Sequence, residues 1–125
     1  MAQSTEILPN GLQLLQDDRF FKLGQDSVLL SAFAKPRRNA KLLDLGCGTG
    51  ALALLVWRPD LTITGLELQD GPLDLFRQSI AANELENVTA LQGDLRQMRT
   101  LLPHGSMDYV ICNPPYFDRN AGANA

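Results

Sequence analysis

The chain has 125 residues, of which 45% are hydrophobic and 20% charged, so it can build one hydrophobic core but hardly two. Eleven basic and 14 acidic side chains give a net charge of −3, which excludes a strongly basic protein that binds nucleic acid by charge alone. No apolar run is long enough to span a membrane, the N-terminus lacks a signal-peptide pattern, and two cysteines are too few for a disulfide scaffold. We therefore expect a reduced, cytoplasmic protein.

Residues 1–40 are predicted to form a β-hairpin followed by a helix. Asn10-Gly11 lies between apolar runs, and this dipeptide is typical of a hairpin turn. Asp26 is a suitable N-cap for the helix, which Pro36 ends. A group of basic side chains follows, which either contact RNA phosphates or form a solvated connection. This group consists of Lys35, Arg37, Arg38 and Lys41.

From residue 41 the pattern changes to alternating strands and helices. The predicted strands cover residues 41–45, 61–67, 88–91 and 107–112, with helices at about 50–58, 70–84 and 94–102. This alternation indicates βαβ units and hence a parallel sheet with right-handed crossovers. We assign residues 41–117 to this α/β core and expect the small, polar residues 118–125 to form a disordered tail.

The first strand of this core runs directly into three glycines at alternate positions, in Asp44-Leu45-Gly46-Cys47-Gly48-Thr49-Gly50. Ligands of open α/β sheets bind at the carboxyl ends of the strands, where glycines let the backbone approach a ligand closely. The spacing differs from the dinucleotide pattern G-x-G-x-x-G, and Asp44 would repel a pyrophosphate. A cationic ligand without phosphate, such as S-adenosylmethionine, suits this turn better than a dinucleotide does.

Two further carboxylates follow the next two strands. Glu67 ends the second strand, where a carboxylate accepts hydrogen bonds from ribose hydroxyls, unless it is simply a solvated charge. Asp94 follows the third strand, and either contacts the adenine amino group, caps the next helix, or does both.

The second motif is Asn113-Pro114-Pro115-Tyr116, directly after the fourth strand. An amine conjugated to an aromatic ring is a poor nucleophile because its lone pair is delocalised. Acceptors on Asn113 and on the Pro114 carbonyl would pull such a nitrogen toward sp³ geometry, and Tyr116 would stack on the ring. The alternative is a rigid turn that merely closes a strand.

As a set, these motifs resemble those of class I S-adenosylmethionine-dependent methyltransferases that act on amino groups. The resemblance implies an α/β, Rossmann-like fold with a mostly parallel seven-stranded sheet, of which this chain holds four strands after its N-terminal hairpin and helix. It implies S-adenosylmethionine as cofactor, no metal, and an acceptor held by Asn113, Pro114, Pro115 and Tyr116. The implied cofactor-binding residues are Asp44, Gly46, Cys47, Gly48, Gly50, Glu67, Leu68, Asp94, Leu95 and Asn113.

The N-terminal part, with its hairpin and the run Phe21–Leu30, is similar to the start of bacterial tRNA1(Val) adenine-N6 methyltransferases. This resemblance implies adenine N6 in tRNA as the acceptor. A protein glutamine in a release factor, and a non-catalytic cofactor-binding fragment, are the alternatives. We expect a C-terminally truncated chain with weak or absent catalysis alone, whose fourth strand forms an exposed sheet edge open to association.

Overall fold

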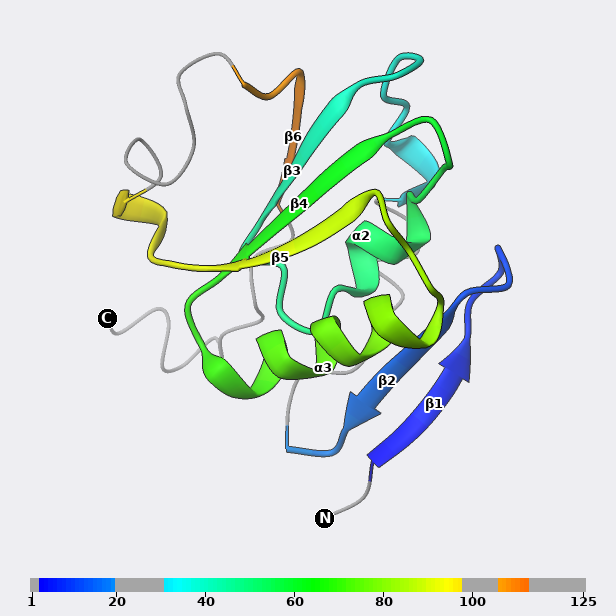
Figure 1. The fold of residues 1–125 in the computed structure, drawn as a ribbon, viewed down its shortest axis with the longest axis vertical. Coiled ribbons are helices and arrows are strands. Elements are labelled where there is room, and N and C mark those ends of the chain that lie inside the picture. The colour runs from blue at the N-terminus through cyan, green and yellow to red at the C-terminus, as the bar shows by residue number, and fades with distance from the viewer. Residues whose placement is uncertain (1–2, 20–30, 98–105, 113–125) are drawn as a thin grey trace.

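The computed structural model describes residues 3–19, 31–97 and 106–112, which form two β-sheets with flanking helices (Figure 1). The elements in chain order are β1 (Gln3–Ile7), β2 (Gln13–Asp17), β3 (Lys41–Leu45), α2 (Ala51–Leu55), β4 (Thr62–Glu67), α3 (Asp70–Ala82), β5 (Val88–Gln92), the 3-10 helix η1 (Leu95–Gln97) and β6 (Tyr109–Cys112). None of these described helices is long and apolar enough to cross a membrane.

The larger sheet has the strand order β5-β4-β3-β6, and all of its strand pairs are parallel. β3 lies between β4 and β6, so that Leu45 stands beside both Leu66 and Cys112. The carboxyl ends of the strands therefore lie side by side, and we call this end the carboxyl edge of the sheet. This order confirms the predicted parallel α/β architecture, and β6 forms an outer strand of the described sheet, as expected.

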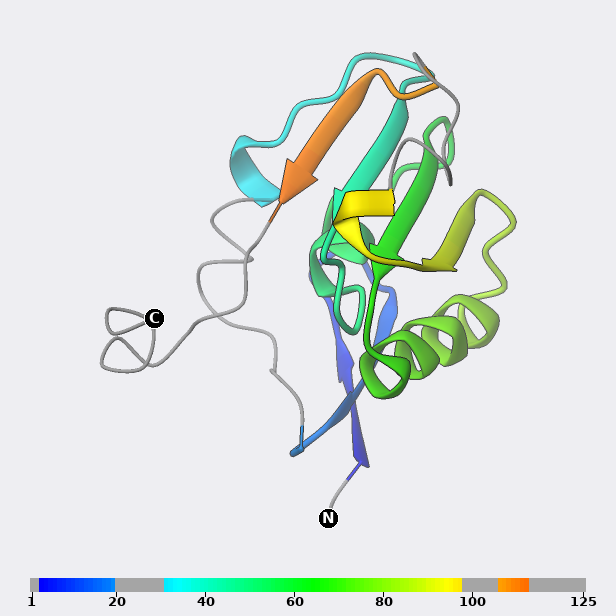
Figure 2. The same ribbon diagram turned by 90° about the vertical axis from the view of Figure 1, so that its left-hand side faces the viewer.

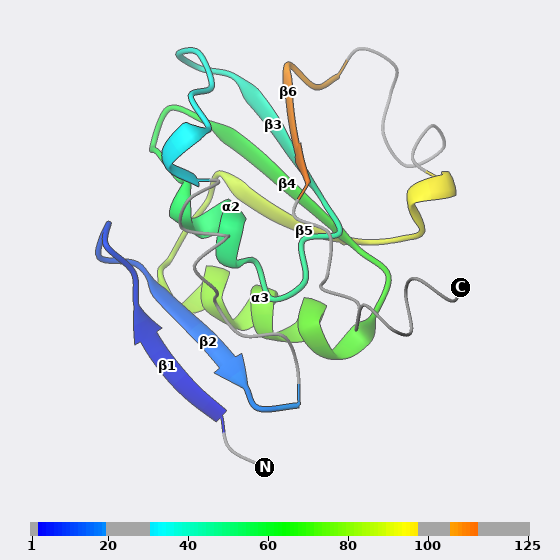
Figure 3. The same ribbon diagram turned by 180° about the vertical axis from the view of Figure 1, so that it is seen from behind.

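The helices α2 and α3 cover one face of this sheet (Figure 3). The strand register places Leu42, Ile63 and Val88 in one row across that face, and all three are buried. Phe76 of α3 is completely buried and belongs to the same cluster. Because side chains alternate between the two faces of a strand, this row and the helices above it make one continuous core.

The hairpin of β1 and β2 is present, and it docks on α3 through side chains (Figure 3). The backbone N–H of Leu15 donates to Ser79 Oγ at 2.9 Å, and that of Gln13 donates to Asn83 Oδ1 at 2.8 Å. The Asn83 amide returns a hydrogen bond to the Gln13 carbonyl at 2.8 Å. These bonds satisfy the edge of β2 that does not pair with β1, while every residue of β1 is exposed.

Two helices are shorter than the sequence pattern predicts. α2 ends at Leu55 rather than near Arg58, since Pro59 disfavours helical backbone at the residue before it. α3 ends at Ala82 rather than Glu84, because Glu84 turns into the left-handed region with φ of +53°. Strand boundaries differ from the prediction by two residues at most.

Several sequence predictions lie outside the described residues. These are the helix N-cap at Asp26, the predicted end of the helix that starts at Asp94, and the tail at residues 118–125. Within the described part of that second helix, residues Leu95–Gln97 form a 3-10 turn.

Candidate functional site

The glycine turn after β3 combines three residues with left-handed backbone. Gly46, Gly48 and Gly50 have φ of +64°, +56° and +89°, values that cost a side-chain-bearing residue roughly 1 kcal/mol or more each. A Cβ at Gly46 or Gly48 would meet no atom within 4 Å, whereas at Gly50 it would lie 2.1 Å from Phe76 Cδ1. The first two glycines thus leave open space beside the turn, and the third is required by the packing of α3.

The carboxylate of Glu67, at the end of β4, holds this turn in place. Its Oε1 accepts the N–H of Gly48 at 2.8 Å and its Oε2 accepts the N–H of Gln69 at 2.9 Å. Glu67 is therefore more than a solvated charge at a strand end. Each oxygen of a carboxylate has a second lone pair, so a Glu67 fixed in this way retains acceptor capacity for a ligand hydroxyl.

Asp44 lies beneath the turn with only 1% of its surface exposed. Neither carboxylate oxygen has a hydrogen-bond partner among the described residues, since the nearby N–H of Ala53 does not reach hydrogen-bond geometry. Burial raises the pKa of Asp44 to about 8, and the negative charge of Glu67 adds to the rise while the Ala53 N–H opposes it. A buried carboxyl without a partner is uncommon in folded proteins, and a cation brought next to it would favour its ionised form. The donor set of this turn therefore fits a cationic ligand.

The turn after β5 lies next to the end of β4, because the N–H of Gly93 donates to the Glu67 carbonyl at 3.0 Å. Asp94 Oδ1 accepts the N–H of Arg96 at 2.9 Å, and Gln97 Oε1 accepts the N–H of Asp94 at 3.2 Å. These two bonds cap the start of η1, so the capping role foreseen for Asp94 is confirmed. The Arg96 guanidinium also holds the pKa of Asp94 down, at about 2.

The remaining predicted ligands fall into different groups. Leu68 is 60% exposed beside Glu67, whereas the side chain of Leu95 lies outside what the structure describes. Cys47 is buried, and a Cβ at Gly65 would lie 2.8 Å from its Sγ, so its side chain packs inward and only its backbone follows the turn. Burial also raises the pKa of the Cys47 thiol. Cys47 and Cys112 are both free, although their strands are neighbours.

The Asn113, Pro114, Pro115 and Tyr116 motif lies outside the described residues. Cys112, the last described residue before it, pairs with Leu45 at the start of the glycine turn. An unforeseen contact at the carboxyl edge of the sheet involves Gln92, whose amide donates to the Leu68 carbonyl at 3.2 Å and to the Asp70 carboxylate. No spacing rule signals such an amide in the sequence.

The sequence model of the family described as "Methyltransferase small domain" matches residues 24–124. The chain belongs to this family. Its members share the class I fold of S-adenosylmethionine-dependent methyltransferases, in agreement with the four-stranded parallel sheet seen here. The small-domain match covers both the glycine turn and the Asn-Pro-Pro-Tyr motif.

Curated relatives of the chain give a second comparison. The chain is 36% identical over 105 residues to a "tRNA1(Val) (adenine(37)-N6)-methyltransferase" of Pseudoalteromonas translucida, covering 82% of this chain and 44% of that protein. It is 34% identical over 100 residues to the protein of the same name from Yersinia enterocolitica, covering 77% and 39%. The chain thus spans less than half the length of these curated relatives.

Solved structures of the same fold include TrmN from Thermus thermophilus, with a TM-score of 0.58 and 23% identity over 79% of this chain and 29% of that one. The Pyrococcus abyssi tRNA (uracil-54, C5)-methyltransferase, solved with S-adenosyl-L-homocysteine, has a TM-score of 0.69 at 16% identity, over 90% of this chain and 28% of that one. At these identities the likeness concerns the fold alone.

Proposed function

We propose that this chain binds S-adenosylmethionine at the carboxyl edge of its parallel sheet and serves methyl transfer to an exocyclic amine, adenine N6 in tRNA. The observation that carries the proposal is the buried carboxylate of Asp44, which has no hydrogen-bond partner in the described part of the chain and lies beneath an open glycine turn. The names of relatives at 32–36% identity support tRNA adenine as the acceptor and, with it, a cytoplasmic location.

Each part of the cofactor is assigned to the described residues whose chemistry suits it. The cationic amino-acid end suits the Asp44 carboxyl, and the ribose hydroxyls suit the free lone pairs of Glu67. The bare backbone of Gly46 and Gly48 leaves room for close approach. Asp94, Leu68 and Leu95 follow the two neighbouring strands and are assigned to the adenine end. When bound, the cofactor supplies an electrophilic methyl group on a sulfonium sulfur.

The acceptor is assigned to the motif that follows β6. The Asn113 side-chain oxygen and the Pro114 carbonyl accept the two N–H groups of the amine, Pro115 limits the backbone, and Tyr116 stacks on the base. The reaction forms a bond from the amine nitrogen to the methyl carbon, breaks the bond from that carbon to sulfur, and releases one amine proton to solvent. Positioning and fixed dipoles suffice here, because the nitrogen needs alignment rather than a strong base.

Isothermal titration calorimetry with S-adenosylmethionine tests the cofactor assignment. We expect one-to-one binding by the wild-type chain, and loss of binding in Asp44→Asn and in Glu67→Gln. The matched control is Glu86→Gln, which neutralises an exposed carboxylate on the connection from α3 to β5 and is expected to bind normally. A folded chain that does not bind, or a control that loses binding equally, would overturn the proposal.

Methyl transfer is then measured with labelled cofactor, an unmodified tRNA transcript and a release factor as alternative acceptor. Labelled N6-methyladenosine in the tRNA digest supports the proposed acceptor, and label in the protein supports glutamine instead. Binding without transfer to either acceptor would identify the chain as a cofactor-binding portion whose catalysis requires further residues.

A further inference from the structure

The connection that leads into β3 carries the densest group of positive charges among the described residues. We call residues 33–41 the basic segment. Its cationic side chains are all exposed, and three of them form no ion pair with a described residue. The exception is Arg37, which pairs with Asp108 at 3.1 Å. The cationic members are Lys35, Arg37, Arg38 and Lys41.

The same segment begins with an exposed aromatic side chain. Phe33 is 78% exposed, more than the other large hydrophobic side chains in the described part of the chain that lie outside the core. A single exposed apolar residue needs no explanation by itself. Next to a row of cations, however, an exposed aromatic ring matches the surfaces that bind single-stranded nucleic acid, where bases stack on rings and phosphates contact cations.

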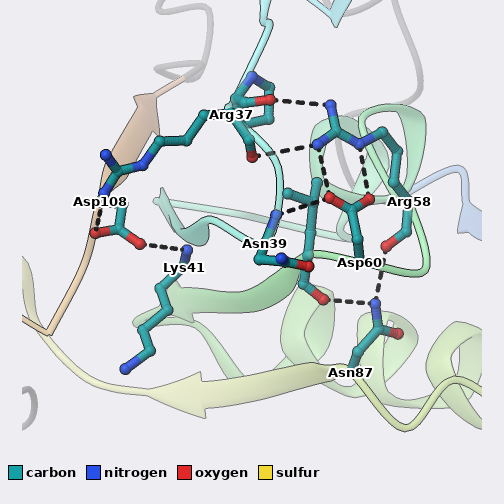
Figure 4. A network of polar contacts seen from close by, with 9 residues as sticks. Arg37, Asn39, Lys41, Arg58, Asp60, Asn87 and Asp108 are labelled. Carbon is teal, nitrogen blue, oxygen red and sulfur yellow. Dashed lines mark hydrogen bonds and ion pairs between the residues drawn. The ribbon is translucent and has the colours of Figure 1, made fainter.

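Hydrogen bonds from Arg58 and Asp60 hold the backbone of the basic segment in place (Figure 4). The Arg58 guanidinium donates to the carbonyls of Pro36 and Arg37 at 3.0 and 3.2 Å, and is itself paired with Asp60 at 2.9 Å. The Asp60 carboxylate also accepts the N–H of Asn39 at 2.8 Å. Two partly exposed side chains from the α2–β4 connection thus hold the main chain, while the cationic side chains of the segment are exposed. A surface fixed in this way loses little conformational entropy when it binds a ligand.

The basic segment contacts the amino-terminal end of β6, which is an outer strand of the described sheet (Figure 2) and leads to Asn113. The Asp108 carboxylate, just before β6, accepts the N–H of Lys41 at 2.9 Å. The N–H of Lys35 donates at 3.3 Å to the hydroxyl of Tyr109, the first residue of β6. The segment is therefore joined to the amino-terminal end of the strand that the acceptor motif follows in the sequence.

We propose that the basic segment binds the RNA strand that carries the target base, with its cations on the phosphates and Phe33 stacked on a base beside the target. This inference rests on the proposed function and adds the surface that holds the substrate. With Arg58, the segment and its surroundings present five basic side chains against the two carboxylates of Asp60 and Asp108, in a chain whose net charge is −3. Such a separation of charge attracts a polyanion to one side of an acidic molecule. An acidic protein partner would use the cations but has no purine or pyrimidine ring for Phe33, so RNA is favoured.

The test measures the affinity of the chain for an unmodified tRNA transcript by fluorescence anisotropy, between about 50 and 200 mM salt. We expect Lys35→Ala combined with Arg38→Ala to reduce the slope of log K against log salt by about 1.4 to 1.8, since each phosphate contact contributes about 0.7 to 0.9. We expect Phe33→Ala to weaken binding at least about fivefold without changing that slope. The controls are Arg77→Ala, an exposed arginine on α3, and Ile7→Ala, a 64% exposed apolar residue on β1.

Binding of S-adenosylmethionine by the same variants separates the two proposals, because no residue of the basic segment belongs to the cofactor site. Loss of RNA affinity with unchanged cofactor binding supports the inference. If the variants match their controls while the wild-type chain binds RNA, the surface is wrong and the proposed function stands. If the wild-type chain binds cofactor but no RNA at the lowest salt, both the surface and the RNA acceptor are overturned. Equal competition by polyglutamate would overturn RNA as the occupant in favour of an acidic protein.

Discussion

Replacement of Asp44 by Asn is expected to make the chain more stable in the absence of cofactor. The pKa of Asp44 rises from 3.8 to about 8 on folding, so between these values the folded chain holds a proton that the unfolded chain has lost. Stability conferred by this group is therefore complete below the unfolded pKa and is lost as pH rises toward 8. With about 1.4 kcal/mol for each pH unit, the cost of Asp44 reaches about 4 kcal/mol at neutral pH. This is a sizeable share of the stability of a small domain.

Urea unfolding of both proteins at about pH 5 and about pH 7 measures the effect. The free energy of unfolding of the wild-type chain, relative to Asp44→Asn, is expected to fall by about 2 to 3 kcal/mol over that interval. The Glu86→Gln variant is the control, with the pH dependence of the wild type. Equal pH dependence of Asp44→Asn and wild type, or a variant that is less stable at neutral pH, would refute the reasoning. Asp44→Asn is also expected not to bind cofactor, since a residue that serves binding need not favour stability.

Three other substitutions test separate parts of the site and its support. Gly50→Ala places a Cβ 2.1 Å from Phe76 and is expected to lower the free energy of unfolding by about 2 to 4 kcal/mol. Gly46→Ala meets open space and is expected to cost only about 1 kcal/mol of backbone strain. Equal losses of stability in thermal melts of the two variants would contradict this. Glu67→Gln leaves one N–H of the turn without an acceptor, so it is expected to lower the free energy of unfolding by about 1 to 3 kcal/mol as well as to abolish cofactor binding. Calorimetry measures both effects, and unchanged stability would disprove the bridging role of Glu67. Asn83→Ala removes the hydrogen bonds from Asn83 to Gln13 of β2. Backbone amides of the hairpin are then expected to exchange faster with solvent, while those of the parallel sheet stay protected. An equal increase in exchange in the hairpin and in the sheet would argue against hairpin docking.

Much of the fold follows from the sequence because local signals and the global arrangement agree. The apolar runs at 41–45 and 62–67 are short, bounded by turn residues and separated by a helix, so parallel pairing was predictable. The glycine turn was predictable for a different reason, since alternating glycines after a strand have few uses other than left-handed backbone. Helix ends were less accurate, because they depend on single residues such as Pro59 and Glu84.

The state of individual site residues was beyond sequence reasoning. Asp44 was expected to face a cation, but its complete burial and lack of a partner depend on how α2 packs over the strand. Glu67 was expected to bind ribose hydroxyls, but its hydrogen bond to the glycine turn could not be predicted, because it depends on the register of β3 and β4. Likewise, Arg37 reads as one of four equivalent cations until its pairing with Asp108 is seen. Each of these properties arises from contacts between distant segments.

During synthesis the N-terminal hairpin leaves the ribosome well before the residue to which it binds. Its partner Asn83 lies 70 residues beyond Gln13. At about 5 to 20 residues per second, roughly 4 to 14 seconds separate the synthesis of the two. During that interval Leu8 and Leu14, which belong to the core cluster, lack the cover of α3. A nascent chain of this sequence is therefore expected to be most prone to aggregation and chaperone capture before α3 emerges, and to bury β2 only after that helix has been made.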